Sequence, residues 1–518
     1  MDIKEKVGQR LMIGINGKTI NREAKEHLQE IKPGSIILFN RNISSAEQVH
    51  KLITQIHELL PLNPLIAVDQ EGGRVIRFTK DLTVFPGNMA LGAVDSLNLA
   101  YQQGLLSAYQ LKKIGIDLNL APVVDVITSS HNPGITTRSF GDDPKRVSDL
   151  AIAFIQGTQK MRVAAVSKHF PGKGAAEVDA HFDLPTITIS KRSFEKTHLF
   201  PFRKAVKNDV KGIMSTHIYC PALDSKGHYP ATFSQKIVKD YIRTKLNYNG
   251  VIFSDDLEMG AIVKYYSIEE ACIKATLAGH DILLICSSYQ LQKQGFHTLV
   301  DAYTNYLLPI EELDTSVKRI QNLKKFCNMN IPLDRYKTLL KPEALAQKIA
   351  QQSIALISNK KHLLPIDSKK VKDLLLLIPD LSVLPILEEG YKPTEKHFLI
   401  KECKRYFSGT LAFHFFPLSL GHREIEEISK LKNKHTLCIT FISNAQENKG
   451  QRFLIKKLQK WNEEAIFVLM DNPFDLEFLS PKDTCITSYG FRKIQLLSLL
   501  KVIFGKVKAT GKLPFKEN

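Results

Sequence analysis

One short stretch of the chain, residues 168–185, reads KHFPGKGAAEVDAHFDLP and concentrates side chains that can exchange protons or bind anions. It opens with Lys168 and His169, crosses a turn rich in Gly and Pro, and reaches Asp179 and His181. Residues two apart on an extended chain face the same way, so the Asp179 carboxylate can orient the His181 ring and stabilise its imidazolium. A loop that only joins two elements needs neither two imidazoles nor an acid, and we interpret this loop as part of a site.

A pair of carboxylates follows an apolar run in the string GVIFSDDLEMGA. Asp is a good helix N-cap, and we expect Asp256 to cap the helix that follows. Asp255, in contrast, stands at the end of the apolar strand, which aims its side chain at the mouth of the sheet. A fixed carboxylate there suits a nucleophile or a group that stabilises an oxocarbenium ion.

A third group of polar residues occurs in the string VDQEGGRVIRF. Asp69 ends an apolar run, and Arg74 and Arg77 follow a diglycine that permits a tight turn. No Lys-Ser/Thr pair of a P-loop accompanies the glycines, which makes them weak evidence for phosphate binding. We interpret the string as a polyol-binding element, in which a carboxylate accepts from vicinal hydroxyls and an arginine donates to oxygen. Arg138, in TTRSFGDDP, could add a second donor.

Several of the candidate site residues lie at the ends of apolar runs that alternate with helical stretches in the first part of the chain. Eight such runs occur: LMIGI, SIILF, LIAVD, DLNLAPV, AAVSKH, GIMSTH, GVIFSD and DILLIC. Strands that alternate with helices predict an α/β fold with a parallel sheet, and eight strands can close it into a (β/α)8 TIM-type barrel. Asp69, His169, His217 and Asp255 each stand where a run gives way to a loop, at the rim where such barrels build active sites.

The rest of the chain predicts a second α/β unit, with strands near VKDLLLLI, TLCITFIS and AIFVLMD. We therefore expect a catalytic barrel domain at 1–335, a linker at 336–350 and a C-terminal α/β sandwich domain at 351–518. We expect the second domain to have a structural role and the chain to be a monomer or a homodimer.

Composition favours an ordinary globular protein with no nucleic-acid or membrane partner. No apolar run approaches the ~20 residues that span a bilayer, and the first residues contain no apolar signal region, so we expect a cytoplasmic protein. The net charge is +18, and from residue 336 onward 30 Lys and Arg stand against 19 Asp and Glu, a net +11. These lysines are dispersed, which is typical of a solvated surface. The seven cysteines form no CxxC pair, and we expect them to be reduced core residues.

Taken together, these strings resemble glycoside hydrolase family 3, and within it the two-domain form of the β-N-acetylglucosaminidase branch. The matching strings of the barrel are VDQEGGRVIRF, LAPVVDV, RSFGDDP, KHFPGKGAAEVDAH, MSTHIYCPALD, PATFS and VIFSDDLEMGA. The strings that resemble the family's sandwich domain are SIALISNKKHLLPI, VLMDNPFDLEFL and SYGFRKIQLLSLLKVIFGKVKATGKLPF. The resemblance therefore extends in order along most of the chain.

The resemblance implies a retaining exo-β-N-acetylglucosaminidase that uses no cofactor and no metal. Asp255 corresponds to the family's nucleophile, and the DAH string supplies the acid/base, His181, with its partner Asp179. The residues implied to hold the sugar in the −1 site are Asp69, Arg77, Arg138, Lys168 and His169. The implied substrates are cell-wall muropeptides of the GlcNAc-1,6-anhydro-MurNAc type, from which terminal GlcNAc is removed during peptidoglycan recycling.

One position departs from the family pattern. Lys173 stands where the family has His in its PG-H-G string. The departure bears on how the loop closes and on the leaving group that the site prefers, whereas the DAH and SDDL strings are intact. If His181 is not the acid, Glu71 and Glu258 are the next candidates.

Three other functions fit parts of the pattern. A metal-dependent hydrolase could use His169, His217 and Asp255 as ligands, although no HxH or HExxH string occurs. A catalytically silent sugar-binding homologue would keep the pocket without the chemistry, and the presence of Asp179, His181 and Asp255 argues against it. A β-N-acetylglucosaminide phosphorylase would use the same residues with phosphate in place of water, because a His acid/base repels phosphate less than Glu would.

Overall fold

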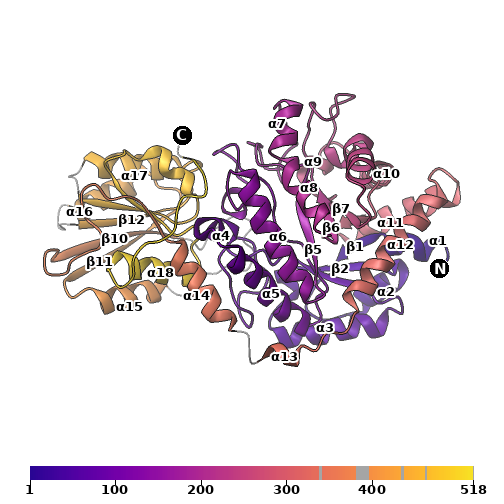
Figure 1. Ribbon diagram of the computed structural model, residues 1–518, viewed down its shortest axis with the longest axis horizontal. Coiled ribbons are helices and arrows are strands. Elements are labelled where there is room, and N and C mark those ends of the chain that lie inside the picture. The colour runs from indigo at the N-terminus through magenta and orange to yellow at the C-terminus, as the bar shows by residue number, and fades with distance from the viewer. Residues whose placement is uncertain (338–340, 381–395, 433–436, 461–463, 517–518) are drawn as a thin grey trace. The chain divides into compact units, whose positions relative to one another are not determined.

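In the computed structural model, eight parallel strands in the first part of the chain close into a barrel (Figure 1). The strands pair in sequence order, and β1 (Leu11–Gly14) closes the ring by pairing with β8 (Ile282–Ile285). The other strands are β2 (Ser35–Leu38), β3 (Leu65–Val68), β4 (Leu118–Asn119), β5 (Ala164–Phe170), β6 (Gly212–Ser215) and β7 (Val251–Asp256). This confirms the predicted TIM-type barrel. The structure describes residues 1–337, 341–380, 396–432, 437–460 and 464–516.

Helices follow each of the eight strands, and several of them begin at a polar cap. Asn21, Ser45, Ser267 and Ser288 each accept a hydrogen bond from the backbone amide three residues on, which satisfies one of the free amides of a first turn. The helices up to residue 337 are α1 (Ile3–Gln9), α2 (Arg22–Ile31), α3 (Ala46–Leu59), α4 (Asn88–Val94), α5 (Leu97–Lys113), α6 (Pro144–Lys160), α7 (Lys191–Lys196), α8 (Leu199–Lys207), the π-helix η4 (Lys236–Lys245), α9 (Gly260–Val263), α10 (Ile268–Ala278), α11 (Tyr289–Thr304), α12 (Ile310–Cys327) and α13 (Asp334–Lys337).

Apolar side chains fill the inside of the barrel. In β1 and β2, Met12 and Ile37 belong to this inner cluster, whereas Ile13 and Ile36 pack outward against the helices. This alternation is the two-residue period of a strand that is buried on both faces. Phe253 of β7 and Val166 of β5 complete the filling, and both are fully buried. The barrel is therefore solid, and polar chemistry is confined to its rims.

The second unit contains a six-stranded sheet with helices on both faces. Its strand order is β11 (Thr410–Pro417), β10 (Asp373–Asp380), β12 (Leu437–Ile442), β13 (Ala465–Leu469), β14 (Thr484–Thr487) and β9 (Ala355–Ser358). All neighbours pair in parallel except β9, which is antiparallel to β14. One face packs against α15 (Lys396–Tyr406) and α18 (Lys493–Ile503), the other against α16 (His422–Lys432) and α17 (Lys449–Lys460). The predicted α/β sandwich is confirmed.

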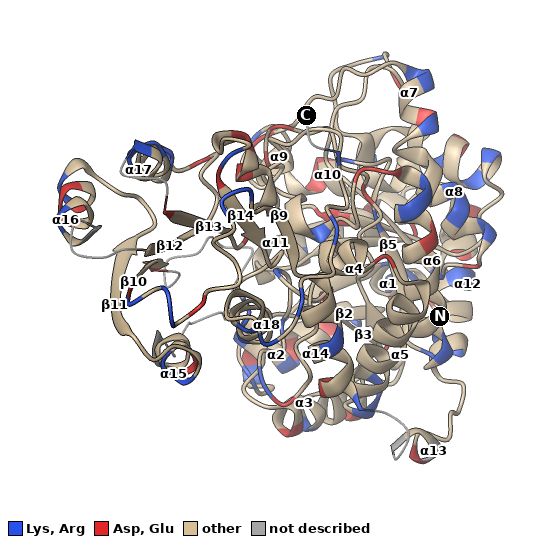
Figure 2. Ribbon diagram, turned by 60° about the vertical axis from the view of Figure 1, so that its left-hand side comes forward, with Lys and Arg blue, Asp and Glu red and all other residues tan. Residues whose placement is uncertain are grey.

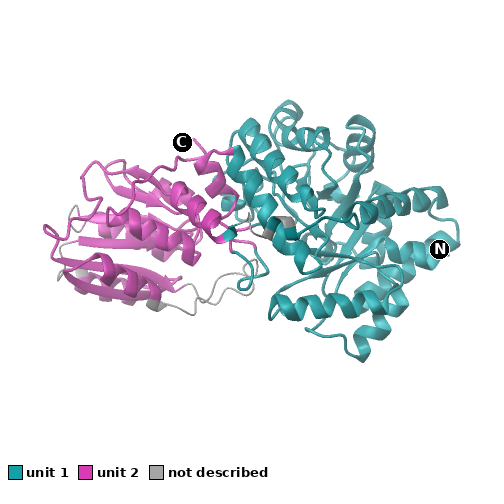
Figure 3. Cartoon of the chain, turned by 60° about the horizontal axis from the view of Figure 1, so that its bottom comes forward, with its two compact units in different colours: residues 1–71, 76–83, 97–342 teal, residues 72–75, 84–96, 343–518 magenta. Residues whose placement is uncertain are grey.

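The two compact units do not divide the chain at a single point (Figure 3). The first unit comprises 1–71, 76–83 and 97–342, and the second comprises 72–75, 84–96 and 343–518. Two short segments of the predicted 1–335 domain thus pack with the second unit. Most of the predicted linker, 336–350, is occupied by α14 (Pro342–Ser353), whose Leu345 and Ile349 are buried; residues 338–340 lie outside the described residues.

Arg492, a buried residue of the second unit, holds one of these segments. Its Nε donates to the carbonyl of Gly73 at 2.8 Å, and a terminal nitrogen donates to that of Arg74 at 3.1 Å. Gly73 has a φ of +58°, and a Cβ at this position would lie 2.6 Å from the Cα of Gly87. The diglycine therefore makes the tight turn that the sequence predicts, and only glycine fits the close approach.

The surface and the cysteines agree with the expectations from composition. Basic and acidic residues alternate along the helices (Figure 2), as in α16, which carries Arg423 and Lys430 beside Glu424, Glu426 and Glu427. All seven cysteines are buried and free. Among the helices that the structure describes, none is long and apolar enough to cross a membrane.

We predict that Arg492→Met destabilises the second unit by about 1–3 kcal/mol, because the carbonyls of Gly73 and Arg74 lose their donor inside the protein. Chemical denaturation of the purified protein, followed by far-UV circular dichroism, measures the effect. The exposed neighbour Lys493 provides the matched control as Lys493→Met. Equal stability of the two variants would contradict the prediction.

Candidate active site

Polar side chains gather at the rim formed by the carboxyl ends of the barrel strands. Asp69 directly follows β3, Lys168 and His169 lie among the last residues of β5, and Asp255 is the penultimate residue of β7. His217 follows the end of β6 by two residues. Because parallel strands of a closed barrel all end on the same side, these five side chains share one rim.

A buried ion-pair network connects several of them. The Lys168 ammonium lies 2.7 Å from both Asp69 Oδ1 and Glu71 Oε1. Arg138 donates two hydrogen bonds to the Glu71 carboxylate, at 3.0 and 2.8 Å, and Arg77 reaches Asp69 Oδ2 at 3.2 Å. The structure thus brings together four of the five predicted sugar-binding residues and joins them through Glu71.

The charges of this network stabilise one another. Burial acts to raise the pKa of Asp69, but Lys168 and Arg77 together lower it to about 2. Burial also acts to raise the pKa of Glu71, but Arg138 and Lys168 lower it overall. The pKa of Lys168 is raised, because its two carboxylate partners outweigh burial. All these groups are charged at neutral pH, so Glu71 holds no proton to donate as an acid.

His169, the fifth predicted sugar-binding residue, has both ring nitrogens engaged. Its Nδ1 lies 2.8 Å from Asp125 Oδ2, and its Nε2 lies 3.4 Å from a terminal nitrogen of Arg138. Arg can only donate, so Nε2 accepts and Nδ1 carries the proton. Burial, with help from Lys173 and Arg138, lowers the pKa of His169 well below its usual value. The ring is therefore neutral and fixed in one tautomer.

His217 is held in the opposite tautomer. Its Nε2 lies 2.9 Å from the backbone carbonyl of Asp256, which can only accept, and its Nδ1 lies 2.8 Å from the Thr232 hydroxyl. Burial lowers the pKa of His217. Both histidines proposed as ligands of a metal-dependent hydrolase are thus engaged with protein groups. Within the described part of the chain, no cluster of three or more His, Cys, Asp or Glu could hold a metal ion.

Asp255 is the least constrained carboxylate of the rim. It is half-buried, and its Oδ1 accepts one hydrogen bond, from the backbone amide of Asp256 at 3.0 Å. Among the residues that the structure describes, no cation lies within ion-pair distance of it. The second oxygen of Asp255 is therefore available to a bound molecule.

The neighbouring acids have structural roles. We expected Asp256 to cap the next helix, but the N-cap of α9 is Met259. Asp256 Oδ1 instead accepts from the amides of Glu258 at 3.1 Å and Cys286 at 3.3 Å, which links β7 to the end of β8. Burial raises the pKa of Asp256 to about 7. Glu258 accepts from the amides of Ser287 and Ser288 ahead of α11, so this candidate acid is also engaged.

Asp179 and His181 form the pair that the sequence predicts. His181 Nδ1 lies 2.7 Å from Asp179 Oδ1, which also accepts the His181 amide at 3.0 Å. Burial acts to raise the pKa of Asp179, but the hydrogen bond from His181 lowers it overall. The His181 side chain is 38% exposed, and in the described part of the chain its Nε2 has no partner. The backbone of this pair contacts the segment that follows Asp255, because the amide of Ala261 donates to the carbonyl of Ala180 at 3.0 Å.

Lys173, the departure from the family pattern, is buried in the same region. Its amide donates to Asp125 Oδ1 at 2.7 Å. Burial and Arg138 lower the pKa of its ammonium, while Asp255 and Asp179 oppose the shift. The Lys173 ammonium therefore interacts electrostatically with the carboxylates of both Asp255 and Asp179.

Sequence reasoning considered Glu71 only as an alternative acid and missed its place in the network, and it gave Asp125 no role. Glu71 lies two residues after Asp69, and the shared face of such positions could have indicated it. Asp125 accepts hydrogen bonds from the amides of His169 and Lys173 as well as from the His169 ring. Burial raises its pKa to about 6. No local signal in the string LAPVVDV announces this role.

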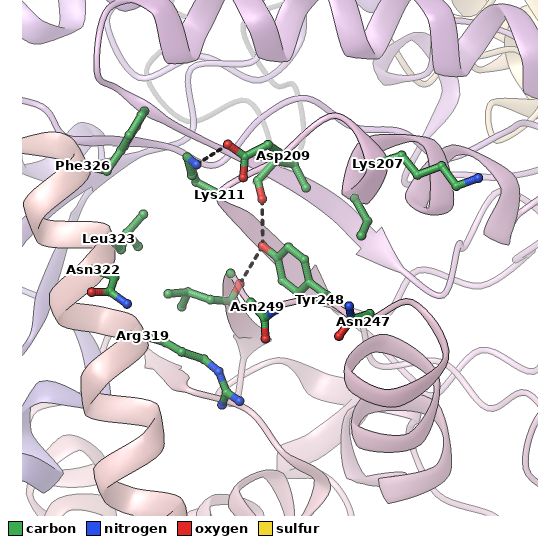
Figure 4. A pocket seen from close by; sticks show the side chains of 14 residues that line it. Lys207, Asp209, Lys211, Asn247, Tyr248, Asn249, Arg319, Asn322, Leu323 and Phe326 are labelled. Atoms are coloured by element: carbon green, nitrogen blue, oxygen red, sulfur yellow. Dashed lines mark hydrogen bonds and ion pairs between the residues drawn. The ribbon is translucent and has the colours of Figure 1, made fainter.

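A separate pocket of about 360 Å³ lies at the opposite end of the barrel (Figure 4). Lys211 and Gly250, which precede β6 and β7, line it together with Arg319 of α12 and the ring of Tyr248. The Tyr248 hydroxyl donates to the carbonyl of Val210 at 3.2 Å. Because the pocket lies at the amino ends of the strands, none of the candidate catalytic residues lines it.

The barrel thus carries a buried network of carboxylates and cations at its rim and a His–Asp pair on a neighbouring loop. Residues 2–323 match the N-terminal domain of glycosyl hydrolase family 3, and the chain belongs to this family. The chain is thus a glycoside hydrolase, as the resemblance of its strings predicted.

Individual relatives agree with this assignment. The chain is 38% identical over 283 residues to a β-hexosaminidase of Nitrosomonas eutropha, an alignment that covers 54% of this chain and 80% of that protein. It is 28% identical to β-hexosaminidase A of Pseudoalteromonas piscicida, with 96% and 92% of the two chains covered. The solved structure of a family 3 β-N-acetylglucosaminidase from Paenibacillus sp. str. FPU-7 superposes with a TM-score of 0.92 at 30% identity and covers 100% of this chain and 99% of that one. The predicted branch and two-domain form are confirmed.

The buried network predicts how stability depends on pH. The pKa of Asp69 is about 2 in the folded chain, against roughly 3.9 when unfolded. The ionised carboxylate therefore contributes about 2–3 kcal/mol above pH ~4, and this contribution disappears as the pH falls toward ~2.

Asp69→Asn should accordingly be less stable than the wild type at neutral pH and lose less stability on acidification. Urea titrations between about pH 2.5 and 7 measure the difference in free energy of unfolding. Asp301→Asn, on the exposed surface of α11, provides the control. A wild-type advantage that grows as the pH falls would contradict the assignment of Asp69 to the network.

Proposed function

We propose that the chain is a retaining exo-β-N-acetylglucosaminidase with Asp255 as nucleophile and His181 as acid/base. One observation carries this proposal: most candidate catalytic side chains have their polar atoms bonded to other protein groups, whereas two keep a reactive atom without a protein partner in the described part of the chain. His169, His217, Glu71 and Glu258 are all held by protein partners. In contrast, one carboxylate oxygen of Asp255 and Nε2 of His181 have no partner among the described residues, so both can react with a substrate.

The two residues complete a double-displacement mechanism. A carboxylate oxygen of Asp255 attacks the anomeric carbon while the bond to the leaving oxygen breaks, and the His181 imidazolium transfers its Nε2 proton to that oxygen and becomes neutral. The neutral His181 then takes a proton from water as the water attacks the anomeric carbon and releases Asp255. Two inversions retain the β configuration.

Asp179 makes a histidine suitable for this role. Its carboxylate accepts from His181 Nδ1, which fixes the ring so that Nε2 carries the exchangeable proton. The imidazolium that forms during deglycosylation lies against this anion and is stabilised by it. A histidine also adds no second anion near Asp255 when substrate binds.

The buried network suits recognition of a sugar in the −1 site. We assign Asp69, Arg77, Arg138, Lys168 and His169 to this role. Lys168 uses two of its three donors on carboxylates, so one N–H is available to a sugar hydroxyl. The carboxylate of Asp69 keeps acceptor positions beyond its two ion pairs, which suits vicinal hydroxyls.

We further propose that the substrates are GlcNAc-containing muropeptides of the GlcNAc-1,6-anhydro-MurNAc type, cleaved in the cytoplasm during peptidoglycan recycling. The hexosaminidase relatives support the GlcNAc preference, and the seven free, buried cysteines suit a reducing compartment. No cofactor is required, because the chemistry uses only a carboxylate and an imidazole.

The two catalytic roles can be separated by the leaving group. His181→Ala should lose ~10²–10⁴-fold in kcat/KM on a GlcNAc disaccharide, but far less in kcat/KM on 4-nitrophenyl GlcNAc, because nitrophenolate leaves without protonation. Asp179→Ala should change the two rates in the same direction. Asp255→Asn should be inactive on both substrates, since every turnover requires the covalent bond. Steady-state kcat and kcat/KM on the two substrates provide the measurement.

An equal loss for His181→Ala on good and poor leaving groups would contradict its role as acid. Running the wild-type assay with and without phosphate tests the phosphorylase alternative, which would release GlcNAc 1-phosphate instead of GlcNAc. Strong preference for 4-nitrophenyl glucose, or loss of activity with EDTA, would overturn the assignment as a whole.

A further inference from the structure

The loop that carries His181 has little structure of its own. Between the end of β5 at Phe170 and the start of α7 at Lys191, the described chain forms turns and one isolated bridge, Thr186 to Tyr219. The side chains at its tip are largely in solvent, and Phe182 is 64% exposed. The position of His181 must therefore come from contacts with another element.

Backbone contacts with the segment after Asp255 supply part of this support. The amide of Ala261 donates to the carbonyl of Ala180 at 3.0 Å. A Cβ at Gly260 would lie 2.3 Å from the carbonyl oxygen of His181, so the two backbones are in close contact. Ala180 and Leu184 of the loop pack against Met259 and Ala261 in a small apolar cluster.

A polar contact closes the other side of the loop. Asp183 Oδ1 accepts from the Tyr265 hydroxyl at 2.6 Å, and Oδ2 lies 3.2 Å from the Lys264 ammonium. The same carboxylate accepts the amide of Leu184 at 2.8 Å, which fixes the turn that follows His181. The hydrogen bond from Tyr265 and that from the Leu184 amide lower the pKa of Asp183 to about 2. The Asp183 carboxylate is therefore ionised at neutral pH, where it accepts from Tyr265 and pairs with Lys264.

We infer that Asp183, Tyr265 and Lys264 form a latch that positions His181 over the site. Met259–Tyr265 follows directly on the strand end that bears Asp255, so one connection of the barrel supports both proposed catalytic groups. The latch residues touch neither substrate nor reacting atoms in this account and act through His181. This inference rests on the proposed function, in which His181 is the acid/base.

The expected effect follows from the surroundings of the latch. All three of its residues are at least partly exposed, so their loss should release the loop without unfolding the barrel. Asp183→Ala should reduce kcat about 10-fold on a GlcNAc disaccharide, a fraction of the ~10²–10⁴-fold that general acid catalysis contributes. The rate on 4-nitrophenyl GlcNAc should change by less than about 2-fold.

Matched variants distinguish positioning from a structural role. Asp183→Asn keeps an acceptor for Tyr265 and should retain most of the disaccharide rate, whereas Tyr265→Phe should resemble Asp183→Ala. Glu195→Ala removes a comparable exposed ion pair, to Lys245 at 2.9 Å, and should leave both rates unchanged.

The decisive test is a double-mutant cycle between Asp183→Ala and His181→Ala, read on both substrates. If Asp183 acts through His181, the double variant should be no slower than His181→Ala alone. A further loss in the double variant, or an equal loss on both substrates for Asp183→Ala, would overturn the inference.

Amide hydrogen exchange of residues 176–185 separates this test from that of the proposed function. Faster exchange in Asp183→Ala than in Glu195→Ala is expected, and unchanged exchange would overturn the latch. Suppose that His181→Ala lost equally on both substrates while Asp183→Ala still exchanged faster. The acid/base assignment would then be wrong, and the latch would hold the loop without a role in catalysis.

Discussion

Lys168 makes the central interaction of the barrel's rim, because its ammonium lies 2.7 Å from both the Asp69 and the Glu71 carboxylate. Asp69 and Glu71 follow β3, and both are buried next to a barrel interior that is filled with apolar side chains. Water therefore does not compensate their charges. Removing one partner of a buried pair typically costs about 3–5 kcal/mol, since it leaves an uncompensated charge. Arg138 extends the network to the connection after β4, and Arg77 joins it from the same connection as Asp69 and Glu71. The surface proposed to bind the sugar is therefore rigid before substrate arrives, which reduces the entropy lost on binding.

This rigidity also decides which groups remain available for chemistry. His169 and His217 are fixed in opposite tautomers, and Asp256 and Glu258 accept backbone amides. The reactive groups lie where constraint is lowest: a carboxylate with one backbone bond and an imidazole on a loop. The division suits a glycosidase, in which the sugar must be held still while the acid/base serves first the leaving group and then water.

The sequence predicted much of the fold, because both barrel and sandwich depend on short-range patterns. Runs of apolar residues that end in a polar residue indicated the strands and their shared rim, even though β4 consists of only Leu118–Asn119. Hydrogen bonds between side chains that lie far apart in the sequence leave no such local pattern. The bonds of Arg138 to Glu71, of His169 to Asp125 and of Asp183 to Tyr265 join positions on different connections. The packing of 72–75 with the second unit likewise depends on Arg492, which lies more than four hundred positions away in the chain.

The central claim is that His181 exchanges protons in both halves of a double displacement through Asp255. Azide rescue of His181→Ala on 4-nitrophenyl GlcNAc tests it most directly, because azide needs no general base to attack the glycosyl-enzyme. We expect azide to accelerate turnover of this variant, to leave the wild type unaffected, and to yield the β-configured glycosyl azide. Absence of acceleration, or an α-configured azide, would contradict it.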